Sequence, residues 1–252
     1  MKKILSFLAM TAAILAVSVS CNKPNDDDEE NGGDDSEYVA PIKIDGEFSD
    51  WAKIPAANIA EAKTAADAKH TALKVVKVYA DPVFVFVYFE WDKDQISWHP
   101  NTAPADQDSN AEEVPYHCYI NADGDATTGG FGDQWTDACT DLLFEGFIYP
   151  GGSEIGSYEP EVCKWNGDVN GTGWKWEGLG AFNGLTMGAG IEGKYEFYIT
   201  RELLPMKLND TFSIGFDIQQ GWDSVGVLPN GSDSEDNPGG LVPSLQVTTV
   251  KK

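Results

Sequence analysis

Positive charge is scarce in this sequence of 252 residues. It holds 17 Lys and Arg against 41 Asp and Glu, which gives a formal net charge of −24 at neutral pH. A field of that sign repels the phosphates of nucleic acids and the headgroups of anionic lipids. The composition therefore excludes nucleic-acid binding and attachment to a membrane through basic patches.

Side chains for metal or nucleophilic chemistry are also few. The three histidines, His70, His99 and His117, have no metal-ligand spacing, and no serine lies in a nucleophile elbow. Cys118 follows His117 directly, so on a strand the two point to opposite faces and cannot form a nucleophile–base pair. A glycosidase needs only two carboxylates, and 41 acidic residues always contain some suitable pair. We identify no catalytic residue and expect that the protein is not an enzyme.

Long apolar runs are absent except at the start of the chain. Met1, Lys2 and Lys3 precede an apolar run at residues 4–19, which suits a secretory signal and is too short for a membrane span. The following Ser-Val-Ser-Cys at residues 18–21 resembles the lipobox of bacterial lipoproteins. That resemblance implies that residues 1–20 are a lipoprotein signal peptide and that Cys21 carries the lipid. The alternative is an ordinary cleaved signal.

An acidic segment without large apolar residues follows. Residues 21–37 contain eight acidic residues against Lys23 alone, so they cannot bury enough surface to fold, and we expect a flexible tether over residues 21–40. The acidic run at 26–30 resembles the export signal of Bacteroidetes surface lipoproteins; the alternative is a solubilising linker. The resemblance implies a location at the outer membrane, on the cell surface, with membrane contact through the lipid anchor only.

From residue 41 to 252 the pattern predicts one all-β domain. Residues 83–89 are apolar on both faces, which is typical of a central strand, and residues 212–219 alternate strictly, which predicts one face in the core and one in water. Helix is expected only at 59–68 and briefly after Thr200, ending near Pro205. So many short segments predict a single antiparallel β-sandwich with one or two short helices and long loops. Further strands are expected at residues 73–79, 116–121, 142–149, 173–177, 195–199 and 245–250.

Four motifs in order resemble carbohydrate-binding family 9-like domains, a β-sandwich superfamily with DOMON-like relatives. They are Ile44-Asp45-Gly46 with Trp51, the hairpin at 78–90, the strand and glycine turn at 119–130, and the segments 195–204 and 212–219. The resemblance covers about residues 42–250 and implies a non-catalytic carbohydrate-binding module with a glycan ligand. The alternatives are an accessory subunit of an outer-membrane glycan uptake complex, acting through protein contacts, or a small glycan-active hydrolase.

Tryptophan, with eight copies, is the abundant side chain suited to sugars, because an indole stacks on the C–H face of a sugar ring. Trp174 and Trp176 would share one face of a strand and could form a binding platform; the alternative is that this face is core. Trp98, beside a long acidic insertion, and Trp135, in a glycine-rich loop, are further candidates for lining a groove at the edge of the sandwich.

A set of oxygen side chains suggests a calcium site. Asn121, Asp123 and Asp125 alternate ahead of a glycine pair, and Asp133 follows in the same loop. Ca²⁺ binds six to eight oxygens in such turns. The alternative is a solvated turn in which the Asp side chains accept hydrogen bonds from their own backbone.

Three cysteines besides Cys21 remain in the mature chain. In an oxidising setting we expect one pair among Cys118, Cys139 and Cys163 to bridge. Cys139 with Cys163 is the candidate pair, because it would close a loop over the strand expected at 142–149. The sequence leaves the other pairings open.

Overall fold

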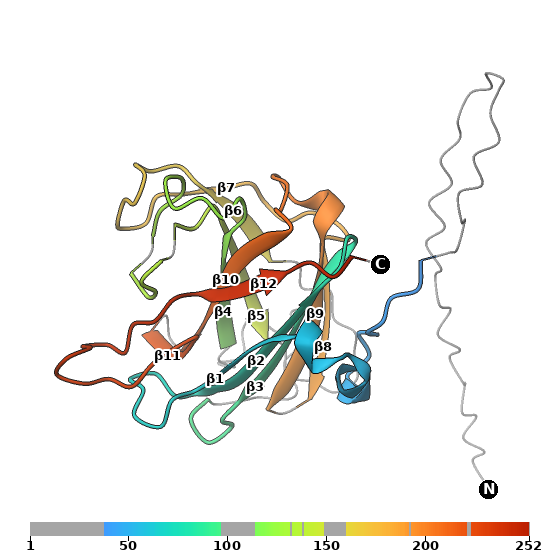
Figure 1. Ribbon diagram of the computed structural model, residues 1–252, viewed down its shortest axis with the longest axis horizontal. Helices are drawn as coiled ribbons and strands as arrows, with labels where there is room; N and C mark the ends of the chain where they lie inside the picture. Colours follow the sequence, from blue (N-terminus) through green and yellow to red (C-terminus); the bar gives the residue numbers. More distant parts are fainter. Residues whose placement is uncertain are drawn as a thin grey trace, which may run out of the picture. The chain divides into compact units, whose positions relative to one another are not determined.

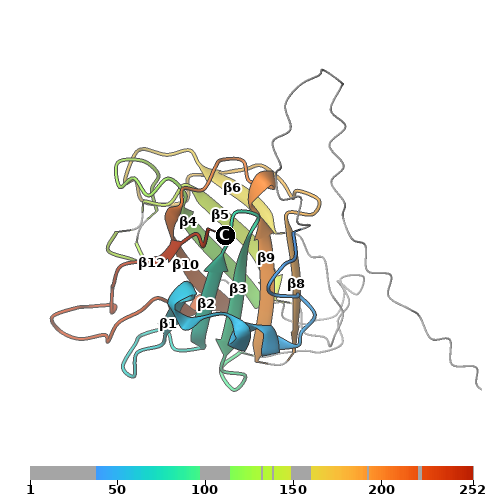
Figure 2. The same ribbon diagram turned by 45° about the vertical axis from the view of Figure 1, so that its right-hand side comes forward.

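Two antiparallel sheets pack face to face in the computed structural model, which describes residues 38–96, 114–131, 133–137, 139–148, 160–191, 193–220 and 223–251 (Figures 1 and 2). In sheet A the strands lie in the order β1 (Ala60–Lys63), β2 (Leu73–Ala80), β3 (Phe84–Trp91), β9 (Lys194–Thr200) and β8 (Thr186–Ile191). In sheet B the order is β11 (Asp223–Leu228), β10 (Thr211–Gln220), β4 (Val114–Asn121), β5 (Leu142–Ile148), β6 (Glu161–Trp165) and β7 (Trp176–Gly178). The short β12 (Leu245–Thr248) pairs with the first half of β10, beyond the end of β11. The predicted antiparallel β-sandwich is confirmed.

Aromatic side chains from both sheets form the core between the layers. Phe89 of sheet A lies 5.0 Å from Phe216 and 6.0 Å from Tyr116 of sheet B, measured between ring centroids. All three side chains are buried. The strand predicted to be central at 83–89 is β3, the middle strand of sheet A, and its two apolar faces pack against this core and against the segment that covers sheet A from outside.

That covering segment, residues 40–59, is called here the N-terminal strap. It contains two 3-10 helices, η1 (Phe48–Lys53) and η2 (Ala56–Asn58), and lies across the outer face of sheet A (Figure 2). Ile42, Ile44 and Trp51 of the strap are buried against Phe86 and Tyr88 of β3. The part of the outer face of sheet A around Phe86 and Tyr88 is therefore buried.

One buried carboxylate holds the strap motif, Ile44-Asp45-Gly46 with Trp51, in place on sheet A. The buried Glu196 of β9 accepts hydrogen bonds from the Trp51 indole Nε1 at 2.9 Å and from the Gly46 backbone N–H at 3.1 Å. Gly46 has φ of +76°, a conformation that other residues rarely adopt. The glycine and the tryptophan thus both serve to fasten the strap to sheet A.

Two local predictions have opposite outcomes. The helix predicted at 59–68 is wrong: residues 60–63 form β1, in which Ala60 and Ala62 pack against the core while Glu61 is exposed. The short helix expected after Thr200 is confirmed as the 3-10 helix η3 (Arg201–Leu203). In the described residues, no helix has the length and apolar character needed to cross a membrane.

Candidate functional site

The outer face of sheet B carries a line of ionisable side chains, called here the polar row: Asp217, His117, Glu145 and Glu161. They lie in direct register on β10, β4, β5 and β6. Residues in register on adjacent strands point to the same face, so these four side chains are neighbours across the sheet. Asp217 and His117 are buried, Glu145 is half-buried and Glu161 is exposed. The row therefore opens to solvent in the direction from β10 to β6.

Asp217 forms the closed end of the polar row. One of its oxygens, Oδ2, accepts hydrogen bonds from Gln134 Nε2 at 3.0 Å, Gln219 Nε2 at 3.0 Å and Ser224 Oγ at 2.8 Å. The side chain is 0% exposed, and all three of these donors are uncharged. A carboxylate at this depth is costly without a cationic partner.

His117 links the two ends of the site. Its Nδ1 lies 3.2 Å from Gln219 Nε2 and 3.2 Å from the Tyr119 hydroxyl, and its Nε2 lies 3.3 Å from Glu145 Oε1. With the Gln219 amide donating to Nδ1, the proton of a neutral imidazole lies on Nε2, facing Glu145. The distance to Glu145 is short, but the geometry is not that of a hydrogen bond.

Several buried polar atoms on this face lack a hydrogen-bond partner within the described part of the chain. They are His117 Nε2, Gln134 Oε1, Trp176 Nε1, Asp217 Oδ1 and Gln219 Oε1. Each such atom costs about 1–3 kcal/mol of stability. Native proteins rarely keep so many in one place unless water or a ligand satisfies them. The cluster therefore has the hydrogen-bonding properties of a binding site for a hydroxyl-rich molecule.

Aromatic rings surround the open side of the polar row. Tyr119 stacks on Phe131 with ring centroids 5.4 Å apart, and Trp176 packs against both rings at 6.2 and 6.1 Å. Trp174 contacts Phe131 at 5.7 Å and His117 at 5.8 Å, yet 52% of its surface is exposed. Of the two tryptophans predicted to form a platform, Trp174 thus presents its ring to solvent, while Trp176 is largely covered.

Trp135, which was expected to line a groove, is buried instead. Its side chain is only 3% exposed, and its indole Nε1 donates to the Pro229 carbonyl at 3.0 Å. The ring lies directly on Gly215 of β10, where a Cβ would come within 2.4 Å of it. Trp135 therefore holds the loop that carries Gln134 against the sheet and offers no ring face to a ligand. Trp98 lies outside the described residues.

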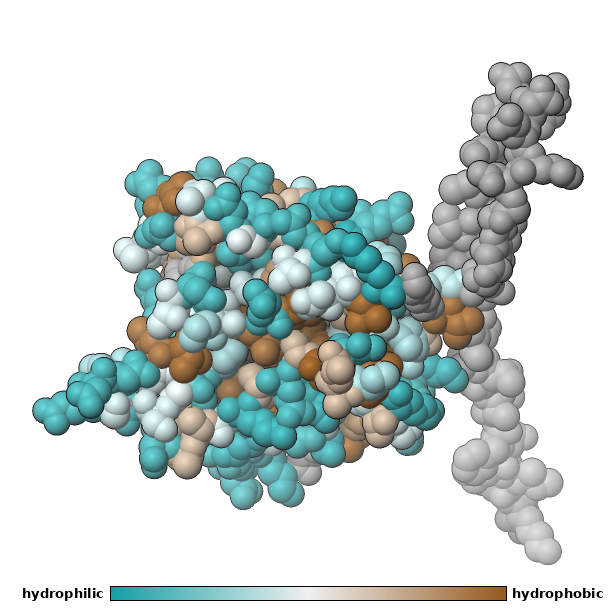
Figure 3. All heavy atoms as spheres, in the orientation of Figure 1, coloured by the Kyte–Doolittle hydropathy of each residue, from teal (hydrophilic) through white to brown (hydrophobic). Residues whose placement is uncertain are grey.

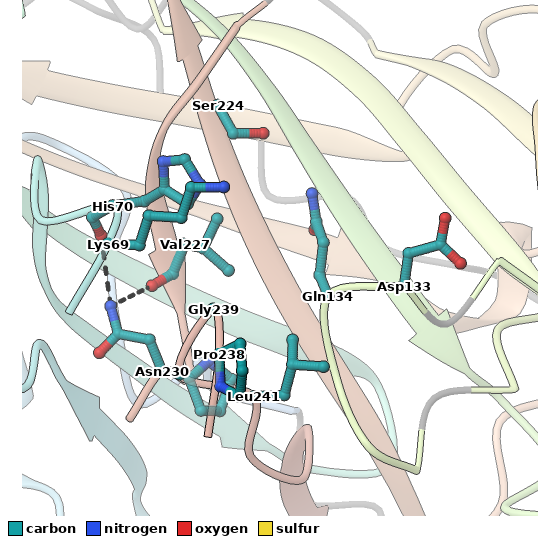
Figure 4. Close-up of a pocket in the computed structure, with 12 residues that line it drawn as sticks. Lys69, His70, Asp133, Gln134, Ser224, Val227, Asn230, Pro238, Gly239 and Leu241 are labelled. Carbon is teal, nitrogen blue, oxygen red and sulfur yellow. Dashed lines mark hydrogen bonds between the residues drawn. The ribbon is translucent and has the colours of Figure 1, made fainter. Parts of the chain in front are cut away.

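A cavity of about 280 Å³ adjoins the closed end of the polar row at β11 (Figure 4). Gln134 and Ser224, both bonded to Asp217, line it. Figure 4 shows Lys69 and His70 on the side of the cavity opposite Gln134 and Asp133. The Asn230 amide on its floor donates to the carbonyls of His70 and Val227. The cavity extends the polar surface of the site beyond the edge of sheet B.

The residues proposed for calcium form an Asx-rich turn. Asn121 Oδ1 accepts from the Gly124 N–H, Asp123 Oδ1 from the Asp125 N–H and Asp125 Oδ1 from the Thr127 N–H, each at 2.8 Å. Asp133 is exposed and lines the cavity instead. Within the described ranges, no three His, Cys, Asp or Glu side chains are grouped as a metal ion would require. Calcium binding stays a prediction.

The cysteines of the domain are free, buried thiols in the structure. Cys118 lies in the core between the sheets, whereas Cys163 lies on the outer face of sheet B, beside Glu145 at 3.6 Å. Burial, and then the charge of Glu145, raises the pKa of the Cys163 thiol to about 12. Cys139 contacts the Ala126 carbonyl and Asn170, so the predicted bridge between Cys139 and Cys163 is not formed in this structure. Cys21 lies outside the described residues.

The sequence did not identify the side chains that make up this site, namely Gln134, Glu145, Asp217 and Gln219, and His117 was expected to be neither a metal ligand nor a base for Cys118. For Asp217 and Gln219, however, the sequence contained a signal. In the segment 212–219 the alternation places Asp217 and Gln219 on the face opposite the core, but that face was expected to be in water. In the structure both side chains are buried.

No protein-family model matches the sequence, and no curated protein matches it. Among solved structures, the chain is similar to a carbohydrate binding module of family 9 from Caldicellulosiruptor kristjanssonii, determined in complex with cellotriose. The sequences are 14% identical, and the match covers 85% of this chain and 92% of the other, with a TM-score of 0.40.

Proposed function

We propose that this protein is a carbohydrate-binding module that holds a glycan on the outer face of sheet B and catalyses no reaction of its own. The observation that carries the proposal is the position of Trp174. Its exposed ring lies against His117 of the polar row, beside a group of buried polar atoms without partners in the described chain. A sugar ring offers both complements at once, since its C–H face stacks on an indole and its hydroxyl groups donate and accept hydrogen bonds.

The rest of the sandwich supports this choice of face. The aromatic centre of the outer face of sheet A is covered by the N-terminal strap, whose Ile42, Ile44 and Trp51 pack against Phe86 and Tyr88. In the orientation of Figure 1, hydrophilic side chains cover most of the visible surface, and apolar ones form small separate groups in its middle and toward its left edge (Figure 3). Trp174 is the one tryptophan among the exposed large apolar side chains of the described residues, and it lies beside the buried polar atoms of sheet B.

We also propose how the chain is anchored. The proposal includes export as a lipoprotein, with Cys21 lipidated and the acidic tether holding the domain at the outer membrane on the cell surface. Mass spectrometry of the mature protein from its own cells is expected to find acyl groups on Cys21; an unmodified residue there contradicts the anchor and leaves the glycan site standing.

The glycan site is tested by replacing Trp174. Wild-type protein is screened against arrays of plant, host and microbial polysaccharides, and the strongest ligand is then titrated by calorimetry. We expect Trp174→Ala to weaken binding about fivefold to 150-fold, because stacking and apolar burial at one ring contribute about 1–3 kcal/mol. Trp174→Phe, which keeps a smaller aromatic face, is expected to recover part of the loss.

The matched control is Leu203→Ala on η3, which removes an exposed apolar side chain outside sheet B and is expected to bind as the wild type does. A folded wild-type protein that binds none of the polysaccharides contradicts the proposal. In that case, co-purification of the native protein with an outer-membrane porin-like partner would favour the alternative role in an uptake complex.

A further inference from the structure

The outer face of sheet B has three carboxylates and the imidazole of His117, but no Lys or Arg side chain, among its described strand residues. The outward positions of sheet B are those in register with the polar row or with Tyr119. In the described strands these positions hold the acidic residues Asp217, Glu145 and Glu161 and no Lys or Arg. Lys69 and His70 lie at the far side of the cavity, beyond β11. A ligand on this face therefore meets a negative field at the open end of the row.

Among the polar atoms without partners on this face, acceptors outnumber donors. Three of them, Asp217 Oδ1, Gln134 Oε1 and Gln219 Oε1, are acceptors. Asp217 and Gln219 are more than nine-tenths buried and lie on the outer face of sheet B. Acceptors and negative charge thus both outnumber their complements on this face, which favours a ligand that carries donors and positive charge.

The middle of the polar row, where Glu145 reaches solvent, has the geometry for such a ligand. Glu145 is the central carboxylate that reaches solvent, with 27% of its side chain exposed, and its Oε1 lies 3.3 Å from His117 Nε2. The exposed Trp174 ring also contacts His117, with the ring centroids 5.8 Å apart. An ammonium group binds favourably both to a carboxylate and over the face of an indole.

We propose, on the basis of the function proposed above, that the bound glycan contains an amino sugar with a free amino group. Its ammonium binds beside His117, between Glu145 and the face of Trp174. Asp217, two strands from Glu145 and so about 10 Å away along the row, adds to the attraction without direct contact. Glycans with carboxylate or sulfate groups are repelled by the same field.

Three β-1,4-linked trisaccharides test this directly: those of glucose, of N-acetylglucosamine and of glucosamine. They share linkage and ring stereochemistry and differ only at C2, which carries a hydroxyl, an acetamide or an ammonium. Calorimetry at low ionic strength, at a pH where the amine is protonated, is expected to find glucosamine bound at least about tenfold more tightly than glucose. Added salt should reduce this ratio, because part of the site is open to solvent and ions screen the attraction.

Glu145→Gln separates the charge from the shape of the site and is expected to lower the glucosamine-to-glucose ratio to about threefold or less. The matched control is Glu202→Gln on η3, an exposed carboxylate outside sheet B, which should keep the wild-type ratio. Equal or tighter binding of the glucose trimer by the wild type overturns the inference and leaves the glycan-binding proposal intact. A ratio unchanged in Glu145→Gln overturns the assignment to Glu145. If none of the three sugars nor any arrayed polysaccharide binds, the proposed function itself fails.

Discussion

Glu196 shows how much one buried carboxylate determines in this domain. Its Oε1 accepts the backbone N–H groups of Asp45 and Gly46, and its Oε2 accepts the Trp51 indole, so three donors of the strap depend on one side chain of β9. Burial raises the pKa of Glu196 above its ordinary value of 4.5, although these hydrogen bonds oppose the shift. The folded state consequently holds a proton on Glu196 more strongly than the unfolded chain does.

That pKa shift predicts the sign of a pH effect. Because the folded pKa is the higher one, Glu196 favours the folded state most at low pH, and this contribution is lost as the pH rises from 4.5 through the folded pKa. Glu196→Gln has no such titration. Unfolding by urea from about pH 4 to about pH 7 is expected to show the stability of the wild type, relative to Glu196→Gln, falling as the pH rises. A difference that is independent of pH contradicts this account.

At the scale of the element, β10 shows where prediction from sequence ends. The strict alternation at 212–219 gave the strand and assigned Phe212, Ile214 and Phe216 correctly to the core. It also separated Asp217 and Gln219 onto the other face. The alternation could not predict that a loop covers this outer face. Trp135 of that loop lies about 80 residues earlier in the chain, rests on Gly215 and helps to bury Asp217 and Gln219. Contacts between segments so far apart leave no local periodicity.

The helix prediction for the segment that contains Ala60 was wrong for a different reason. Ala, Glu and Lys favour helices, and that intrinsic preference predicted a helix at 59–68. The residues of β1 nevertheless alternate, with Ala60 and Ala62 packed against the core and Lys63 paired with the exposed Glu61. Pairing with β2 along four residues outweighs a propensity of a few tenths of a kcal/mol per residue. Strand β8, with two glycines in its six residues, had no β-favouring pattern to detect.

At the scale of the domain, the sandwich is asymmetric in how its two outer faces are used. On sheet A the strap covers aromatic side chains, whereas sheet B presents ionisable ones that loops partly cover. Without the strap, the aromatic patch around Phe86 and Tyr88 would be exposed and would promote association between molecules. The strap motif that resembles family 9 domains thus contributes to the site indirectly, by closing the opposite face.

This division of roles is tested by shortening the chain from its N-terminus in two steps. A chain that begins at Ala40 keeps every strap contact and is expected to unfold at the same temperature as the longer mature chain. A chain that begins at Ala60 lacks Ile42, Ile44 and Trp51, each fully buried and each contributing about 1.5–3 kcal/mol. The resulting loss of about 5 kcal/mol or more is comparable to the whole stability of many domains. We therefore expect this chain to be unfolded or to aggregate through the exposed Phe86 and Tyr88 face, as measured by calorimetry and light scattering. An Ala60 chain that remains monomeric with an unchanged melting temperature would show that the strap does not close sheet A in solution.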